Sequence, residues 1–190
     1  MSDSNPIVAE VRALEQQIMS LTALHAALRR KAFGRNLKNS ILEGPAGQVD
    51  LRDLITAERP KLLLIVNMGV RCNYCMAYAD SIAGVSRHLG EDLTVVLASG
   101  SPVAEIAALR EKRQWPFACY SFTSPALPEE LGLYDANNGV MPGIAGLSRG
   151  ADGIIVTAIN DFEPGDVFAP LWHLRALVDP AWDDLSPKGA

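Results

Sequence analysis

Two cysteines, Cys72 and Cys75, are the residues of this chain whose type and spacing could most directly do chemistry. They follow a short apolar run, residues 61–67, and stand where the next helix is expected to begin. A thiolate at a helix N-terminus is stabilised by the unpaired N–H groups there and by the positive end of the helix dipole. We therefore predict a redox pair in which Cys72 is the nucleophile and Cys75, one helical turn later, is the resolving thiol.

The neighbours of the pair are candidate substrate-binding residues. Arg71 brings a positive charge next to Cys72, which would favour the thiolate form. Asn73 and Tyr74 lie between the two cysteines.

Two other interpretations of the Cys72–Cys75 spacing remain open. One is a pair of buried cysteines without chemistry. The other is half of a zinc site, but no second half is visible among the remaining soft ligands, which are His25, His88, His173 and Cys119. We expect no metal and no cofactor. Cys119 is interpreted as a small apolar residue on a buried strand, with a regulatory thiol as the alternative.

The elements around the pair follow an alternating order. The apolar runs 61–67 and 93–98 predict buried strands, and 77–89 and 102–113 predict helices. A further strand at 116–122, a hairpin of 143–148 with 154–159, and a closing helix over 168–178 follow. Parallel crossovers followed by an antiparallel hairpin predict an α/β fold with a mixed central sheet flanked by helices.

A long helix is expected before this domain. Asn5 is a candidate N-cap and Pro6 suits the first helical position. Apolar residues with alternating spacings of four and three continue to about Lys31, interrupted by His25. Such a helix would be about 40 Å long. It could form a homodimer with a second subunit or lie across its own domain; we assign residues 1–39 to this extension, 40–180 to the domain and 181–190 to a tail.

Composition limits the partners and the location. The net charge of −5 leaves no basic field for nucleic acid. No apolar stretch approaches the ~20 residues that cross a bilayer, so we expect no membrane contact. The N-terminus lacks the order of a secretory signal. Three cysteines, an odd number, fit a reducing compartment, and we expect a cytoplasmic protein.

Over roughly residues 40–178 the sequence resembles the thioredoxin superfamily, and most specifically an uncharacterised family related to alkyl hydroperoxide reductases and thiol-specific antioxidant proteins. The resemblance rests on the cysteine pair, on residues 99–102 and 115–117, on the long N-terminal helix, and on Met141-Pro142 before the hairpin. It implies that Pro142 is the cis-proline that contacts the substrate backbone, with Met141 beside it; an ordinary trans turn proline is the alternative.

The sequence departs from thioredoxin at the positions that tune the pair. Thioredoxins carry Trp before the first cysteine and Gly-Pro between the two, and they bury an acid where this chain has Val66. The general base is therefore missing or supplied from elsewhere.

Three functions follow from these residues. The first is a thiol–disulfide oxidoreductase that acts on a protein or small-molecule disulfide and is restored by an external thiol reductant. The second is a peroxidase, although the peroxiredoxin motif Pro-x-x-x-Thr/Ser-x-x-Cys is absent, because Ile65 and Gly69 occupy its positions before Cys72. The third is a non-enzymatic binding or dimerisation module.

Overall fold

The long N-terminal helix forms as expected. The computed structural model describes residues 5–163 and 165–178 of the chain. Helix α1 spans Pro6–Ala32, and the side chain of its N-cap, Asn5, accepts a hydrogen bond of 3.0 Å from the amide of Ile7. The last turn carries three cations, Arg29, Arg30 and Lys31, next to the negative end of the helix dipole.

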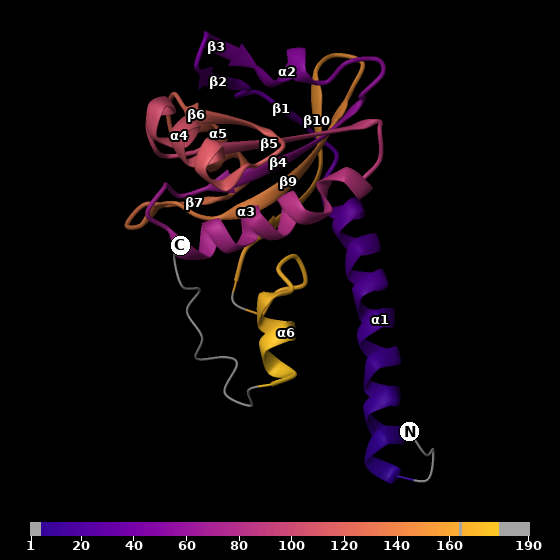
Figure 1. Cartoon of the computed structure of the whole chain (residues 1–190). Coiled ribbons are helices and arrows are strands. Elements are labelled where there is room, and N and C mark those ends of the chain that lie inside the picture. The colour runs from indigo at the N-terminus through magenta and orange to yellow at the C-terminus, as the bar shows by residue number, and fades with distance from the viewer. Residues whose placement is uncertain (1–4, 164, 179–190) are drawn as a thin grey trace.

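An eight-stranded mixed sheet forms the centre of the molecule (Figure 1), with the strand order β1-β10-β9-β4-β5-β6-β2-β3. Strand β4 (Lys61–Asn67) runs parallel to β5 (Leu93–Ser99), which runs parallel to β6 (Ala118–Phe122). The hairpin of β9 (Gly143–Arg149) and β10 (Ile154–Asp161) joins the other side of β4 in antiparallel orientation. The predicted mixed sheet with β4 inside it is confirmed.

The two edges of the sheet were not predicted as strands of it. Strand β1 (Arg35–Leu37) pairs with β10, so part of the predicted N-terminal extension belongs to the sheet. At the other edge β2 (Ile41–Gly44) and β3 (Gly47–Asp50) form a hairpin that pairs with β6 through β2. Helix α2 (Leu51–Leu54) follows directly.

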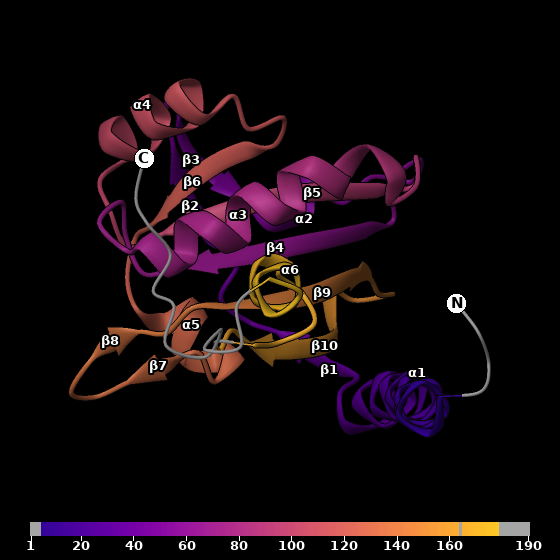
Figure 2. The ribbon, with the colours of Figure 1, turned by 60° about the horizontal axis from the view of Figure 1, so that its bottom comes forward.

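Helices cover both faces of the sheet. Alternate residues of β4 point to opposite faces: Leu62 and Leu64 join one core cluster, whereas Ile65 joins the other. The Ile65 cluster contains buried residues of α3 (Asn73–Val85), α4 (Val103–Arg113) and α6 (Leu171–Ala176), and α3 and α6 lie close together in Figure 2. The opposite cluster is covered by α2 and α5 (Ala126–Leu131).

The remaining short elements are the 3-10 turn Ser86–His88 after α3 and a two-stranded ribbon of β7 (Tyr134–Asp135) and β8 (Gly139–Val140). The closing helix, expected over 168–178, is shorter and begins three residues later. The predicted tail, 181–190, lies outside the described residues, and the division into 1–39 and 40–180 stays a prediction.

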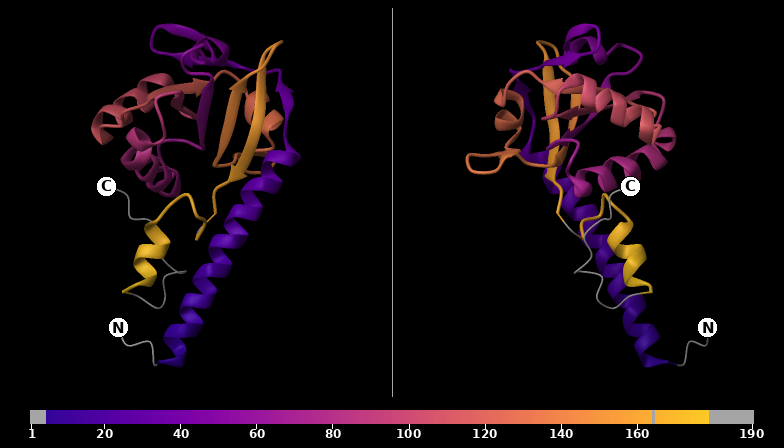
Figure 3. Two further views of the ribbon diagram at one scale, coloured as in Figure 1. Left: turned by 90° about the vertical axis from the view of Figure 1, so that its right-hand side faces the viewer. Right: turned by 60° about the vertical axis from the view of Figure 1, so that its left-hand side comes forward.

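Helix α1 extends away from the rest of the protein (Figure 3). None of its 27 residues is buried. It meets the sheet near its C-terminal end, where it contacts β10 and where the Arg29 guanidinium lies 5.4 Å from the ring centroid of Phe168. The helix does not lie across its own domain.

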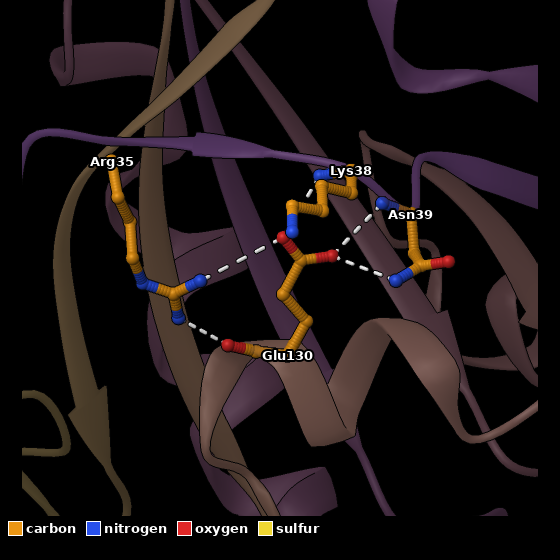
Figure 4. A network of polar contacts seen from close by, with 4 residues as sticks. All are labelled: Arg35, Lys38, Asn39 and Glu130. Atoms are coloured by element: carbon orange, nitrogen blue, oxygen red, sulfur yellow. Dashed lines mark hydrogen bonds and ion pairs between the residues drawn. The ribbon is translucent and has the colours of Figure 1, made fainter.

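One carboxylate anchors the segment that follows α1 (Figure 4). Glu130, on α5, accepts hydrogen bonds from the backbone amides of Lys38 at 2.8 Å and Asn39 at 2.9 Å. The side-chain amide of Asn39 donates to the same carboxylate, and Arg35 pairs with it at 3.7 Å. Burial alone would raise the pKa of Glu130, but these donors outweigh it and hold the pKa below its usual value.

Candidate functional site: a cysteine pair at a helix N-terminus

Cys72 is the N-cap of α3. Its Sγ atom accepts a hydrogen bond from the amide of Cys75 at 3.2 Å, and its carbonyl accepts one from Met76 at 3.1 Å. The sulfur therefore occupies the place where a capping oxygen usually sits, next to N–H groups that have no partner inside the helix. The local sequence produces this arrangement because β4 ends at Asn67 and the turn 68–71 brings the chain directly into α3.

The two cysteines are joined by a disulfide, and their Cα atoms are 5.3 Å apart. Their environments differ: Cys75 is 2% exposed and packs in the core, whereas Cys72 is half-buried at the edge of the same cluster. A reactant arriving from solvent would meet Cys72 first. The roles of attacking thiol for Cys72 and resolving thiol for Cys75 stay a prediction.

An open cleft of about 1060 Å³ lies in front of Cys72. Its walls include Arg71, Asn73 and Tyr74, so the structure brings these three predicted residues together around Cys72. The other wall was not predicted as part of the site: it comes from the loop after β5 and the start of α4, with Gly100, Ser101, Pro102 and Glu105. Carboxyl ends of adjacent parallel strands meet at one edge of a sheet, and that rule would have placed this loop opposite Cys72.

Hydrogen bonds clamp the two loops of the cleft together. The amide of Gly100 donates to the carbonyl of Asn67 at 3.0 Å, and the amide of Val70 donates to Ser101 Oγ at 3.0 Å. The loops approach so closely that a Cβ atom at position 100 would lie 2.6 Å from the carbonyl oxygen of Met68. Only glycine fits at position 100 without a backbone shift.

Asn67 forms the base of the turn before the cysteines and was missed by the sequence analysis. It is fully buried, and its Oδ1 accepts from the amide of Gly69 at 2.7 Å and from Ser99 Oγ at 3.3 Å. The preceding residue, Val66, is 1% exposed and packs in the cluster on the other face of the sheet. The position of the buried thioredoxin acid is therefore apolar here.

Aromatic rings hold α3 against the C-terminal segment. Tyr74 stacks on Trp172 with ring centroids 6.2 Å apart, and Tyr78 stacks on Phe162 at 3.9 Å. The Tyr78 hydroxyl donates to Asp166 at 3.0 Å, and burial together with the negative charge of Asp166 raises its pKa far above 10. These contacts fix the first two turns of α3, and Trp172 is a fully buried core aromatic.

The structure places Met141 and Pro142 at the same edge of the sheet but not in the walls of the cleft. Gly143 pairs with Val66, so Pro142 lies just beyond the carboxyl end of β4. No peptide bond among the described residues is cis, and the expectation of a cis-proline is wrong. The physical reason is local: Met141 donates to the carbonyl of Leu133 and Pro142 accepts from Phe162, both at 2.9 Å, and these bonds hold an extended lead into β9.

Cys119 lies on β6 and is 6% exposed, which confirms its interpretation as a small residue on a buried strand. Burial raises the pKa of its thiol to about 12. At neutral pH it is therefore protonated and unreactive.

Over 5–163 and 165–178, no group of three His, Cys, Asp or Glu side chains could hold a metal ion. No helix in those ranges combines the length and apolarity needed to span a membrane.

The mixed central sheet with helices on both faces defines a thioredoxin-like fold, and this fold is shared with solved peroxiredoxins. Similar solved structures include reduced Prx3 from Vibrio vulnificus in complex with hydrogen peroxide, at 18% identity and a TM-score of 0.56, covering 70% of this chain and 86% of that one. Peroxidoxin BcpB from Mycobacterium tuberculosis has 16% identity and a TM-score of 0.58, with 68% and 84% covered. A hypothetical protein from Sinorhizobium meliloti 1021 has 16% identity and a TM-score of 0.53, with 83% and 88% covered.

At these identities the likeness concerns the fold alone. A comparison with curated protein sequences found no match. A family model does match residues 11–161, and the chain belongs to that family, which is described as a bacterial protein of unknown function, DUF899. The predicted relation to an uncharacterised family of thioredoxin-like proteins is confirmed.

Proposed function

We propose that this protein is a thiol–disulfide oxidoreductase that works through Cys72 and Cys75. The observation that carries the proposal is the hydrogen bond of 3.2 Å from the Cys75 amide to Cys72 Sγ, at the N-terminus of α3. A donor held at this distance stabilises a thiolate more than a thiol, because only the thiolate is charged. Cys72 also faces the cleft, whereas Cys75 is held behind it.

In the proposed cycle the Cys72 thiolate attacks one sulfur of a substrate disulfide. The substrate S–S bond breaks, one substrate thiolate leaves, and Cys72 is joined to the other sulfur. Cys75 then loses its proton and attacks Cys72, which releases the second substrate thiol and leaves the Cys72–Cys75 disulfide. An external thiol reductant returns two electrons and two protons to the pair. The disulfide in the structure corresponds to the oxidised state of this cycle.

A peroxidase is the second candidate, because a structural neighbour was solved with hydrogen peroxide. In that reaction the Cys72 thiolate would attack one peroxide oxygen, the O–O bond would break with the other oxygen leaving as hydroxide, and Cys72 would become a sulfenic acid. The Cys75 thiol would then attack the Cys72 sulfur and form the disulfide with loss of water. The surroundings of Cys72 favour disulfide exchange instead. Its Sγ lies 3.9 Å from the thioether of Met68, and Gly69 stands where the peroxiredoxin motif has a hydroxyl.

The test is a comparison of three single variants, Cys72→Ser, Cys75→Ser and Cys119→Ala. We expect Cys72→Ser to abolish reduction of insulin and glutathione disulfide, and Cys75→Ser to accumulate a mixed disulfide. Cys119→Ala is the matched control, which keeps wild-type rates because that thiol is buried and protonated. Alkylation of reduced protein as a function of pH should show Cys72 reacting well below the ordinary thiol pKa of about 8.5.

The outcomes separate the candidates. Turnover of peroxide at a higher kcat/KM than either disulfide would favour the peroxidase. Two results would contradict the catalytic assignment: unchanged disulfide reduction in Cys72→Ser, or a pKa of Cys72 at or above that of an ordinary thiol. Either result would favour the non-enzymatic binding module. We place the reaction in the cytoplasm, on the support of an odd cysteine count and an unpaired Cys119.

A further inference from the structure

Helix α1 displays an apolar surface that the described part of the chain does not cover. Over residues 5–163 and 165–178, seventeen large apolar side chains are exposed, and eight of them lie on this one helix. An isolated helix is marginal in water, and helices in proteins are stabilised mostly by packing of an apolar face. The other α-helices of the described chain each bury at least one residue, whereas α1 buries none.

Most of these side chains form one seam. Its positions alternate in spacings of four and three, as in the a and d positions of a coiled coil, and are Ile7, Val11, Leu14, Ile18, Leu21, His25 and Leu28. The apolar members of the seam are between 48% and 66% exposed. The face is therefore shaped for another helix with the same repeat.

We propose that α1 pairs in antiparallel orientation with α1 of a second copy of this chain. The register that gives the longest overlap places Ile18 beside Leu21 of the second copy and Val11 beside Leu28 of the second copy. Six of the seven seam positions then pair with one another, including Leu14 with His25 of the second copy, and Ile7 lies opposite Ala32 of the second copy, along about 40 Å of helix.

Charge along α1 selects the antiparallel orientation. The first half carries Glu10 and Glu15, and the last turn carries three cations, Arg29, Arg30 and Lys31. In the antiparallel register Glu10 flanks the seam opposite Lys31 of the second copy, twice by symmetry. A parallel pair would instead set Glu10 against Glu15 of the second copy and would bring the two cationic ends together.

The position of the globular part agrees with this orientation. It joins α1 only at the C-terminal end of the helix (Figures 1 and 3), so an antiparallel pair puts the two globular parts at opposite ends. Leu28 is 53% exposed in the last turn, so the seam stays accessible up to the junction.

Sedimentation equilibrium of the full chain at low ionic strength tests the orientation through charge reversal. We expect wild type to dimerise, and Glu10→Lys and Lys31→Glu each to weaken the dimer by about tenfold, since each converts two attractive pairs into repulsive ones. The double variant restores attraction and should return to within about threefold of wild type. Glu43→Lys makes the same charge change on exposed β2 and should leave the dissociation constant unchanged.

A second pair of variants tests the seam itself. Leu14→Asp combined with Leu21→Asp should give a monomer that keeps the circular dichroism of the globular part. Met19→Asp is the matched control on the same helix, because Met19 is 72% exposed and lies outside the seam. A wild-type monomer at 100 μM, tighter association in Glu10→Lys, or a double charge variant as weak as the single ones would each overturn the proposal.

Discussion

Helices α1 and α3 differ in what holds them. Helix α3 has 13 residues and buries five of them against the sheet and the C-terminal segment. Helix α1 has 27 residues and buries none. Both begin with a capping side chain, so local sequence signals are equally good in the two helices.

The difference shows that capping and periodicity define where a helix begins and ends but not what it packs against. Packing within the chain fixes α3, and with it the position of Cys72. Among the described residues, helix α1 is held near its base by Arg29, by the pairing of β1 with β10, and by Glu130. The following predictions test this contrast.

The largest expected difference between the two helices is in the cost of truncating one apolar side chain on each of them. Ile82 of α3 is 5% exposed, and Ile82→Ala should lower the free energy of unfolding by about 2–5 kcal/mol. Leu21 of α1 is 63% exposed, and in the monomer Leu21→Ala should change the free energy by no more than about 0.5 kcal/mol. Urea unfolding at several protein concentrations measures both. Equal effects at the lowest concentration would contradict the contrast.

Glu130→Gln tests the anchor at the base of α1. In the variant, the NH2 group of Gln would face N–H donors that bond to a carboxylate oxygen in the wild type. We therefore expect the free energy of unfolding to fall by about 1.5–3 kcal/mol. The native pKa of Glu130 is lowered, so its contribution is fully present above the unfolded value of 4.5 and is lost as the pH falls through the lower native value. Urea unfolding between pH 7 and pH 3 should show the two proteins converging at acid pH. A constant difference across this range would be inconsistent with the carboxylate acting as the anchor.

The smallest expected effect is at the contact between Arg29 and Phe168. Phe168→Leu keeps an apolar side chain but removes the ring, and we expect a loss of about 0.5–1 kcal/mol. Amide hydrogen exchange in the last turn of α1 should become faster, while α3 should keep its protection. Faster exchange throughout α3 would show instead that Phe168 acts mainly in the core.

Much of this fold could be predicted from the sequence because its strands are short apolar runs between turn signals. Strands β4, β5 and β6 and the final hairpin have this pattern. The helices between them were predicted as the segments that connect these strands. Strand β1 has three residues and no alternation, and it exists only because β10 is available to pair with it. Such long-range pairing leaves no local signal.

The residues of the site also divide into those that are local in sequence and those that come from distant segments. Cys72, Cys75 and their neighbours are local in sequence, and the cleft contains three of these neighbours as expected. Ser101 and Gly100 come from another loop, and Trp172 comes from the end of the described chain. Their part in positioning α3 depends on three-dimensional contacts that residue spacing does not encode. The trans bond at Pro142 is likewise set by hydrogen bonds to Leu133 and Phe162.

The burial of Cys119 has a practical consequence for measuring the redox state. In the folded protein Cys119, at 6% exposure, and Cys75, at 2%, are both shielded from alkylating reagents, so labelling of native protein reports Cys72: no adduct when the pair is oxidised and one when it is reduced. After unfolding, Cys119 contributes one adduct in either state, and the pair contributes two more only when it was reduced. The chain therefore carries an internal standard, because that constant increment calibrates labelling efficiency while the variable increment reports the electrons stored in the pair.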